Sequence, residues 1–162
     1  MTSLKIIDFW NDYLKFVQSN NQPIPEEYEA WHFSNNETSA NSLAKLVAEG
    51  TKTATASLVW SYEAENSSIP QPGDLSIITL WDETPVCIIE TTEISIHPFN
   101  AVPASFAYDE GEGDRSLNYW RYVHTHFFTE ECIAIGRTPG PDMPVVCEQF
   151  KVVFLSDFYE RF

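Results

Sequence analysis

Two apolar segments separated by a short turn constrain the fold of this chain more than any other feature. Residues 75–81 and 86–96 are rich in β-branched and apolar side chains, and the residues between them include Asp82 and Pro85. Segments of this kind predict a β-hairpin. Pro72-Gly73 precedes the first segment and suits the central positions of a type II turn. We therefore expect the first strand to begin at Leu75.

The N-terminal part of the sequence has helical spacing. Asp8 is a candidate cap for a helix with apolar residues three and four apart, namely Phe9, Trp10, Tyr13, Leu14, Phe16 and Val17. After two prolines, residues 26–33 predict a short second helix. A third helix is expected from the spacing of Ala40, Leu43, Ala44 and Val47, with Thr38 or Ser39 as its cap and Gly50 as its stop.

The C-terminal part mixes helical and extended patterns. Residues 103–108 predict a single helical turn, and residues 115–128 a longer helix capped by Asp114. The expected buried stripe of this helix consists of Leu117, Trp120, Val123 and Phe127. Residues 145–154 alternate as a closing strand. Hairpins with segregated helices predict an α+β fold, in which a small β-barrel would remove exposed sheet edges.

Length and composition favour one folded domain over residues 1–162, since 43% of the residues are hydrophobic and no repeat or change of composition marks a boundary. The net charge of −15 disfavours generic nucleic-acid binding, which depends on cations that meet phosphates. Readout of a single base or of a free nucleoside is compatible with an acidic protein, because it requires stacking and few hydrogen bonds.

The cysteines and the N-terminus bear on the cellular compartment. Cys87, Cys132 and Cys147 are odd in number and far apart, which argues against a disulfide framework and a thiolate zinc site, so we expect them to be reduced and buried. We find no signal-like N-terminus and no apolar run approaching the roughly 18 residues of a membrane span. We therefore expect a cytoplasmic protein that does not bind membranes.

The segment 50–57 is the first candidate for chemistry. It contains Lys52 among small hydroxyl residues, directly after the expected helix stop, in a chain with nine Lys and Arg. A lysine with few competing cations and little bulk around it is typical of an anion or carbonyl site. The alternative is a solvated lysine at a β-edge, with threonines chosen for strand propensity.

The second candidate is the acidic loop at 108–114. It contains four carboxylates in six residues, Asp109, Glu110, Glu112 and Asp114, together with two glycines, and crowded carboxylates raise one another's pKa. A lysine, a Thr hydroxyl and a protonatable carboxyl form a plausible set for hydrolysing an amide. A metal site at these carboxylates is disfavoured because no histidine pattern accompanies them, and we predict neither a metal nor a cofactor.

Further candidates come from the helix and loop that follow. Arg121 and His124, three residues apart, lie on one flank of the expected helix, and His124 is either a hydrogen-bonded core histidine or a ligand-facing one. Arg137 lies in a loop rich in Gly and Pro and is available to an anion. Trp60 or Tyr62 could stack on a base.

The sequence resembles the ASCH domain family over most of the chain. The resemblance rests on the segment 50–57, the acidic loop, residues 120–121, His124 and residues 141–148. The resemblance implies a PUA-like mixed β-barrel with surrounding helices, with residues 1–33 as a helical extension packed on it. It also implies RNA-related roles; some similar proteins hydrolyse acetylated cytidine with a Lys, Thr and Glu set, and a ribonuclease activity is attributed to the family. Lys52 and Thr55 match the motif, and the glutamate is Glu110 or Glu112.

One position departs from the family pattern. An arginine often follows the motif threonine by two residues, and this chain has Ser57 there. Without this cation, the strand is less suited to bind a phosphate group. Arg115, Arg121 or Arg137 would have to take that role.

Two functional hypotheses follow. In the first, neutral, desolvated Lys52 activates Thr55 or a water for amide hydrolysis, one loop glutamate shuttles the proton, and backbone donors near Gly50 hold the oxyanion. Thr53 and Ser57 would then help to bind a nucleoside. In the second, the chain is a non-catalytic RNA-binding or regulatory module that binds a single-stranded element, or it is a ribonuclease. The sequence predicts no oligomeric state.

Overall fold

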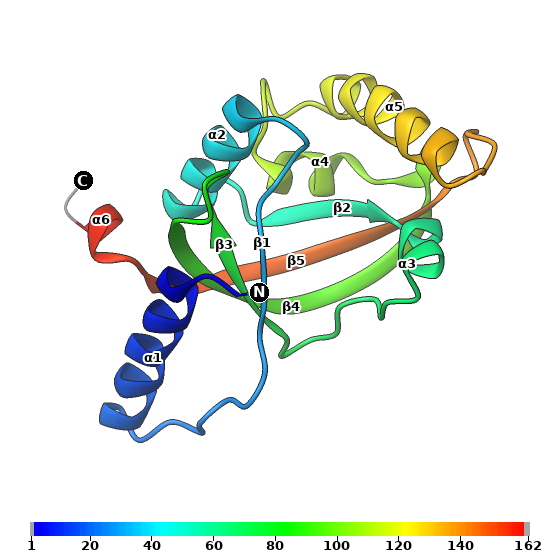
Figure 1. Cartoon of the computed structure of the whole chain (residues 1–162). Helices are drawn as coiled ribbons and strands as arrows, with labels where there is room; N and C mark the ends of the chain where they lie inside the picture. Colours follow the sequence, from blue (N-terminus) through cyan, green and yellow to red (C-terminus); the bar gives the residue numbers. More distant parts are fainter. Residues whose placement is uncertain (1, 161–162) are drawn as a thin grey trace. The chain divides into compact units, whose positions relative to one another are not determined.

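The computed structural model describes residues 2–160 (Figure 1). Within them, the helices are α1 (Leu4–Ser19), α2 (Glu37–Ala48), α3 (Val59–Glu65), α4 (Ala104–Glu110), α5 (Leu117–Ala134) and α6 (Asp157–Glu160), with a 3-10 turn at Phe99–Ala101. The strands are β1 (Glu29–Trp31), β2 (Ala54–Leu58), β3 (Leu75–Thr79), β4 (Pro85–Pro98) and β5 (Pro144–Leu155). None of the described helices is long and apolar enough to cross a membrane.

The five strands form one mixed sheet in the order β1-β3-β4-β5-β2. β1 runs parallel to β3, whereas β3 and β4, and likewise β2 and β5, are antiparallel. This arrangement confirms the predicted α+β class. The chain divides into two compact units, which we describe separately: the first comprises the described residues of 1–50, 73–90 and 151–162, and the second comprises residues 51–72 and 91–150.

The first unit contains the predicted hairpin. β3 begins at Leu75 as expected and pairs with the start of β4, from Leu75 opposite Glu90 to Thr79 opposite Pro85. The side chains of α1 that face inward, Ile6, Trp10, Tyr13 and Val17, pack with Ile77 and Ile88 of the hairpin. The amphipathic helix predicted at the N-terminus is therefore present, but it begins at Leu4, and Asp8 lies inside it rather than at its cap.

The short helix predicted at 26–33 is wrong. Residues 29–31 form β1, whose backbone pairs with Ser76–Ile78 of β3. A partner strand that is distant in sequence offers hydrogen bonds that local spacing does not reveal, and it overrides a weak helical preference.

The predicted third helix is present as α2, with Ala40, Ala44 and Val47 buried. Its cap is Asn36, whose side-chain oxygen accepts from the Ser39 backbone N–H, so the expected Thr38 or Ser39 cap is wrong. Gly50 follows the helix with φ +81°, the left-handed conformation that ends helices. The chain thus turns sharply just before Lys52.

The second unit packs α4 and α5 against one face of β2 (Figure 1). The buried stripe of α5 is Trp120, His124, Phe128 and Cys132, so the predicted stripe is correct at Trp120 and wrong at Val123. Leu117 and Phe127 pack at its edge. The Ser116 hydroxyl caps this helix by accepting from the Tyr119 N–H; Asp114, the predicted cap, accepts from the Ser116 N–H instead.

All three cysteines are free and buried, as predicted. Burial raises the pKa of the Cys87 and Cys147 thiols to about 12. These two thiols therefore stay protonated and unreactive near neutral pH.

Candidate functional site

Lys52 lies at the start of the second unit, two residues before β2 begins. Its neighbour Thr53 is fixed on both sides, because its N–H donates to Asp109 O (2.8 Å) and its carbonyl accepts from Phe150 N (3.0 Å). The Lys52 residue is 2% exposed. The alternative of a solvated edge lysine is therefore wrong.

The Lys52 ammonium contacts the acidic loop. Its Nζ lies 3.0 Å from Glu110 Oε1 and 3.5 Å from Glu112 Oε2. Glu110 is the last residue of α4, 58 positions from Lys52 in sequence, and its side chain is 2% exposed. The structure thus brings together three of the four predicted catalytic residues in one buried ion-pair cluster.

Two glycines let the loop pass close to its neighbours, Gly111 beside Lys52 and Gly113 beside Tyr119. Gly111 and Gly113 have φ of +70° and +57°. A Cβ on Gly111 would lie 2.4 Å from Thr51 O and 3.0 Å from Lys52 Cα, and one on Gly113 would lie 2.4 Å from the Tyr119 ring. Only glycine fits at position 111, where the added atom would meet backbone, and the positive φ favours glycine at position 113 as well.

α5 supplies further partners for Glu110. The Trp120 indole N–H donates to Glu110 Oε2, and His124 Nε2 lies 3.4 Å from the same oxygen. The His124 ring stacks on the Trp120 ring with centroids 4.3 Å apart, and its Nδ1–H donates to Trp120 O (2.9 Å). His124 is therefore a buried, hydrogen-bonded histidine that also belongs to the cluster.

The two glutamates differ in their protonation behaviour. Burial raises the pKa of Glu110, but Lys52, His124 and the Trp120 N–H lower it by more, so the net pKa lies below the usual value. The pKa of Glu112 is raised, chiefly by burial, with Lys52 opposing and Glu110 adding to the rise. The Glu112 side chain is 20% exposed. Of the two, Glu112 is the carboxyl that both reaches solvent and gains a proton more readily.

The cluster also bears on metal binding. Glu110, Glu112 and His124 offer ligand atoms within 4.8 Å of one another. However, the Lys52 ammonium contacts both carboxylates, so a metal ion there would meet a positive charge at close range. The cation of this site is the lysine itself.

The hydroxyl residues of the segment 50–57 lie just before β2 and along it. In β2, Ala54, Ala56 and Leu58 pack against α4 and α5, so Thr55 and Ser57 point to the opposite face. The Thr55 Cα lies opposite that of Glu148 on β5. Ser57 and Tyr62 share a hydrogen bond of 2.9 Å, and Thr53 Oγ1 donates to Asp109 O.

The predicted ligand-binding arginines contact protein groups. Arg137 lies over the Trp60 ring, 5.1 Å from its centroid, and donates to Glu63 (2.9 Å). Arg121 donates to Asn100 O, and Arg115 donates to Tyr108 O. Trp60 and Arg137, predicted separately, are thus neighbours.

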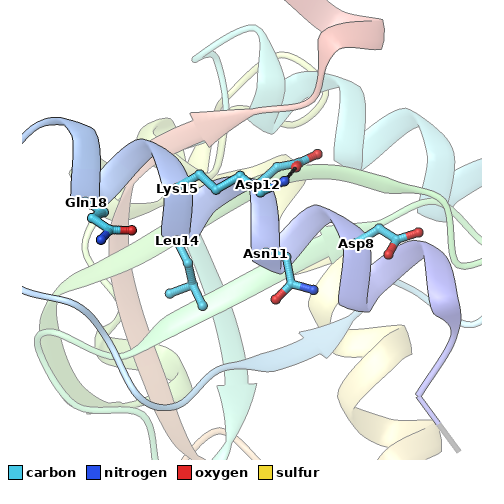
Figure 2. A pocket seen from close by; sticks show the side chains of 6 residues that line it. All are labelled: Asp8, Asn11, Asp12, Leu14, Lys15 and Gln18. Atoms are coloured by element: carbon cyan, nitrogen blue, oxygen red, sulfur yellow. Dashed lines mark hydrogen bonds and ion pairs between the residues drawn. The ribbon is translucent and has the colours of Figure 1, made fainter.

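A shallow hollow lies along the outer face of α1 in the first unit (Figure 2). Its lining is polar and exposed apart from the half-buried Leu14, and Lys15 pairs there with Asp12 at 3.0 Å. It contains none of the predicted site residues and has the character of a solvated helix face.

Comparison with known proteins places the chain in a family. The ASCH domain model matches residues 29–154. The crystal structure of an ASCH domain from Lactobacillus crispatus JV V101 has 37% identity and a TM-score of 0.87, covering 94% of this chain and 96% of that one. A protein from Enterococcus faecalis V583 has 34% identity and a TM-score of 0.82, covering 94% and 95%. A search of the curated proteins finds no match.

The family match and the two structures confirm the predicted resemblance and the PUA-like α+β fold. Lys52, the acidic loop and α5 all lie within the matched residues. The chain belongs to the ASCH domain family.

Proposed function

We propose that this ASCH domain hydrolyses the amide of an acylated nucleoside, such as N-acetylated cytidine, at the cluster of Lys52, Glu110 and Glu112. One observation carries the proposal: a buried ammonium, held by Glu110, lies beside a partly exposed carboxyl group whose pKa is raised. Active sites characteristically pair a fixed charge with a group that can exchange a proton.

The reaction assigns a separate task to each charged group. Ionised Glu112 takes a proton from water as the water oxygen bonds to the amide carbonyl carbon. When Glu112 is protonated it releases the Lys52 N–H that it held, and this N–H donates to the developing oxyanion. Collapse then breaks the C–N bond while Glu112 returns the proton to the leaving nitrogen. The products are acetate and the free amine. This scheme uses a charged Lys52 rather than the neutral lysine expected from the sequence. The reason is that two carboxyl groups lie within 3.5 Å of the Lys52 Nζ.

Glu110 completes the proposed site. Glu110 holds Lys52 in place and is itself held by Trp120 and His124. Thr55, the fourth predicted catalytic residue, points to the face of β2 away from α4 and α5, so it has no task in this scheme.

A neutral nucleoside suits this chain better than a phosphate-bearing ligand. The net charge is −15, and Arg115, Arg121 and Arg137 already donate to protein oxygens. Phosphate recognition would require these arginines to exchange partners, whereas a nucleoside requires only stacking and neutral hydrogen bonds.

The test is turnover of N4-acetylcytidine, followed as release of cytidine by chromatography. Glu112→Gln keeps the shape of the side chain and removes the base, so we expect turnover to fall by about 10²- to 10⁴-fold. Glu130→Gln, an exposed change of equal charge on α5, is the matched control and should retain full turnover. Equal turnover of the two variants would exclude Glu112 from the reaction.

The pair of Trp60 and Arg137 favours a second function, RNA binding without chemistry. An aromatic ring beside a guanidinium is a platform on which a base can stack, if the base displaces Arg137. This alternative predicts that wild-type protein binds single-stranded RNA with a shallow salt dependence and cleaves neither the RNA nor acetylcytidine. RNA cleavage in the same assay would instead support a ribonuclease.

A further inference from the structure

One arginine contacts the three segments that carry the charged cluster, namely the acidic loop, α4 and the segment before β2. The Arg115 backbone N–H donates to Glu112 O (2.9 Å). Its Nε donates to Tyr108 O (2.9 Å) near the end of α4, and its Nη2 lies 3.5 Å from Thr51 O, in the peptide bond that joins Thr51 to Lys52. Arg115 thus links the backbone around all three charged groups.

The backbone of Arg115 has a conformation that most residues avoid. Its φ is +64°, in the left-handed region, where a Cβ crowds the backbone. A glycine would adopt this conformation without that cost, so contacts of the arginine side chain must offset it. Residues held in such conformations gather at functional sites.

The side chain of Arg115 is fixed as well. Its guanidinium carbon lies 3.7 Å from the centroid of the Tyr108 ring. A planar guanidinium can stack on a ring while its N–H groups donate sideways to carbonyls, and a lysine ammonium has neither the plane nor the fork. The contacts of Arg115 therefore require an arginine.

Glu112 depends on its backbone for its position. Its carboxylate lies 3.5 Å from the Lys52 Nζ, whereas that of Glu110 lies at 3.0 Å. The loop is fixed on both sides of Glu112, since Gly111 lies against Thr51 O and Arg115 accounts for the contacts on the other side. Loss of the second attachment would let the carboxylate move away from Lys52.

We propose that Arg115 is a positioning residue, which holds the acidic loop so that Glu112 lies where the proposed reaction needs its base. The inference goes beyond the proposed function and rests on it for the effect on turnover. The competing explanation is that Arg115 only stabilises the end of α4 by donating to a carbonyl there. That role would affect stability and leave the ionisation of Glu112 unchanged.

The test begins with variants that should fold. Arg115→Gly removes the side chain and suits the left-handed backbone, and Arg115→Lys keeps the positive charge without the fork. We expect Arg115→Gly to lower kcat for N4-acetylcytidine by about 10- to 100-fold, with a smaller effect on KM, because it misplaces a reacting group. Arg115→Lys should lower kcat less. Asn66→Gly, at the end of α3 with φ +52°, is the matched control and should retain full turnover.

The pH profile of kcat/KM separates positioning from a structural role. Its acid limb reports the ionisation of Glu112 in the free enzyme. Burial is the largest influence on the pKa of Glu112 and raises it; Lys52 and His124 oppose the rise, and Glu110 adds to it. A loop released from Arg115 exposes Glu112 to water, so the limb should move to lower pH in both Arg115 variants.

The release of the loop can also be measured without turnover. The raised pKa of Glu112 predicts that Glu112→Gln gains stability over wild type as pH rises from acid to neutral. In the Arg115→Gly background this gain should be smaller, because the pKa of the released Glu112 lies closer to that in the unfolded chain. Urea unfolding of the four proteins at a series of pH values measures the difference.

The outcomes distinguish the two proposals. Wild-type turnover with an acid limb that stays in place in Arg115→Gly would overturn the role of Arg115 and leave the proposed function standing. A limb that moves in Arg115→Gly but not in Arg115→Lys would show an effect of charge alone and overturn it too. Wild type without turnover would overturn the proposed function. The unfolding experiment then decides on Arg115, and an undiminished gain in the Arg115→Gly background would overturn its role.

Discussion

The Lys52 ammonium lies 3.0 Å from the Glu110 carboxylate at a depth where the two side chains are 1% and 2% exposed. A pair of this kind loses the hydration of both ions, and its attraction and hydrogen bonds must compensate for the loss. The partners of Glu110 on α5 supply additional hydrogen bonds. The pair and its hydrogen bonds therefore hold α4, α5 and the segment just before β2 in one arrangement around the cluster.

Glu110→Gln should strongly destabilise the protein. The change leaves the Lys52 ammonium buried without its nearest counter-ion, which typically costs about 3–5 kcal/mol in the free energy of unfolding. Urea unfolding would measure the loss, with Glu130→Gln as the control for charge. A loss of less than about 1 kcal/mol, the size typical of an exposed pair, would contradict the account.

The variant that replaces both Lys52 and Glu110 by Met should be more stable than either single variant. Removing both ions leaves no uncompensated buried charge, and methionine fills space adaptably. The same urea experiment tests this. A double variant less stable than both singles would show that the two residues do not form an energetic pair.

Glu112 should make stability fall with rising pH. A carboxyl whose folded pKa lies above the unfolded value of 4.5 binds more protons in the folded state between those two pH values. The free energy of unfolding therefore decreases as pH rises through that window. Relative to wild type, Glu112→Gln should gain stability from acid to neutral pH, measured by unfolding at a series of pH values. Parallel pH profiles would refute the raised pKa.

Gly111→Ala should cost more stability than Gly50→Ala. Both glycines have positive φ, so both alanine variants pay about 1–2 kcal/mol for a left-handed backbone. Only at Gly111 does the added Cβ meet backbone atoms, whereas nothing lies within 4 Å at Gly50. The difference in unfolding free energy, measured in urea, isolates the close approach of the loop to Lys52. An equal loss in the two variants would argue against that approach.

Trp120→Phe should weaken the protein most in acid. The change keeps an aromatic ring and removes the N–H that donates to Glu110, so the pKa of Glu110 rises. Because a carboxyl with a lowered folded pKa loses its stabilising effect as pH falls, the acid unfolding midpoint should move to higher pH. Trp60→Phe, in the same unit, is the control for ring size. Matching acid midpoints would contradict the role of the indole N–H.

Some features of this protein follow from local patterns. The β-hairpin was predictable because Pro72-Gly73 marks a turn and β-branched residues follow it on both sides of a second turn. The pairing of Lys52 with the acidic loop was a reasonable expectation, since the chain has few cations and its glycine-flanked carboxylates need one.

Other features depend on contacts that sequence spacing does not show. β1 needs its partner β3, and without that partner residues 29–31 lie in a segment that reads as helix. The Glu148–Thr91 bond and the donation from Trp120 to Glu110 join elements whose relative placement only the fold determines. The sequence placed Trp120 in the buried stripe of its helix and His124 on the flank, and it did not indicate the carboxylate that the two share.

Turnover of N4-acetylcytidine by Lys52→Met, with near-ultraviolet circular dichroism to verify the fold, tests the central claim most directly. The account predicts that wild type releases cytidine and that the folded variant releases none above background, because the oxyanion loses its ammonium donor. Wild-type turnover in the folded Lys52→Met variant would contradict it.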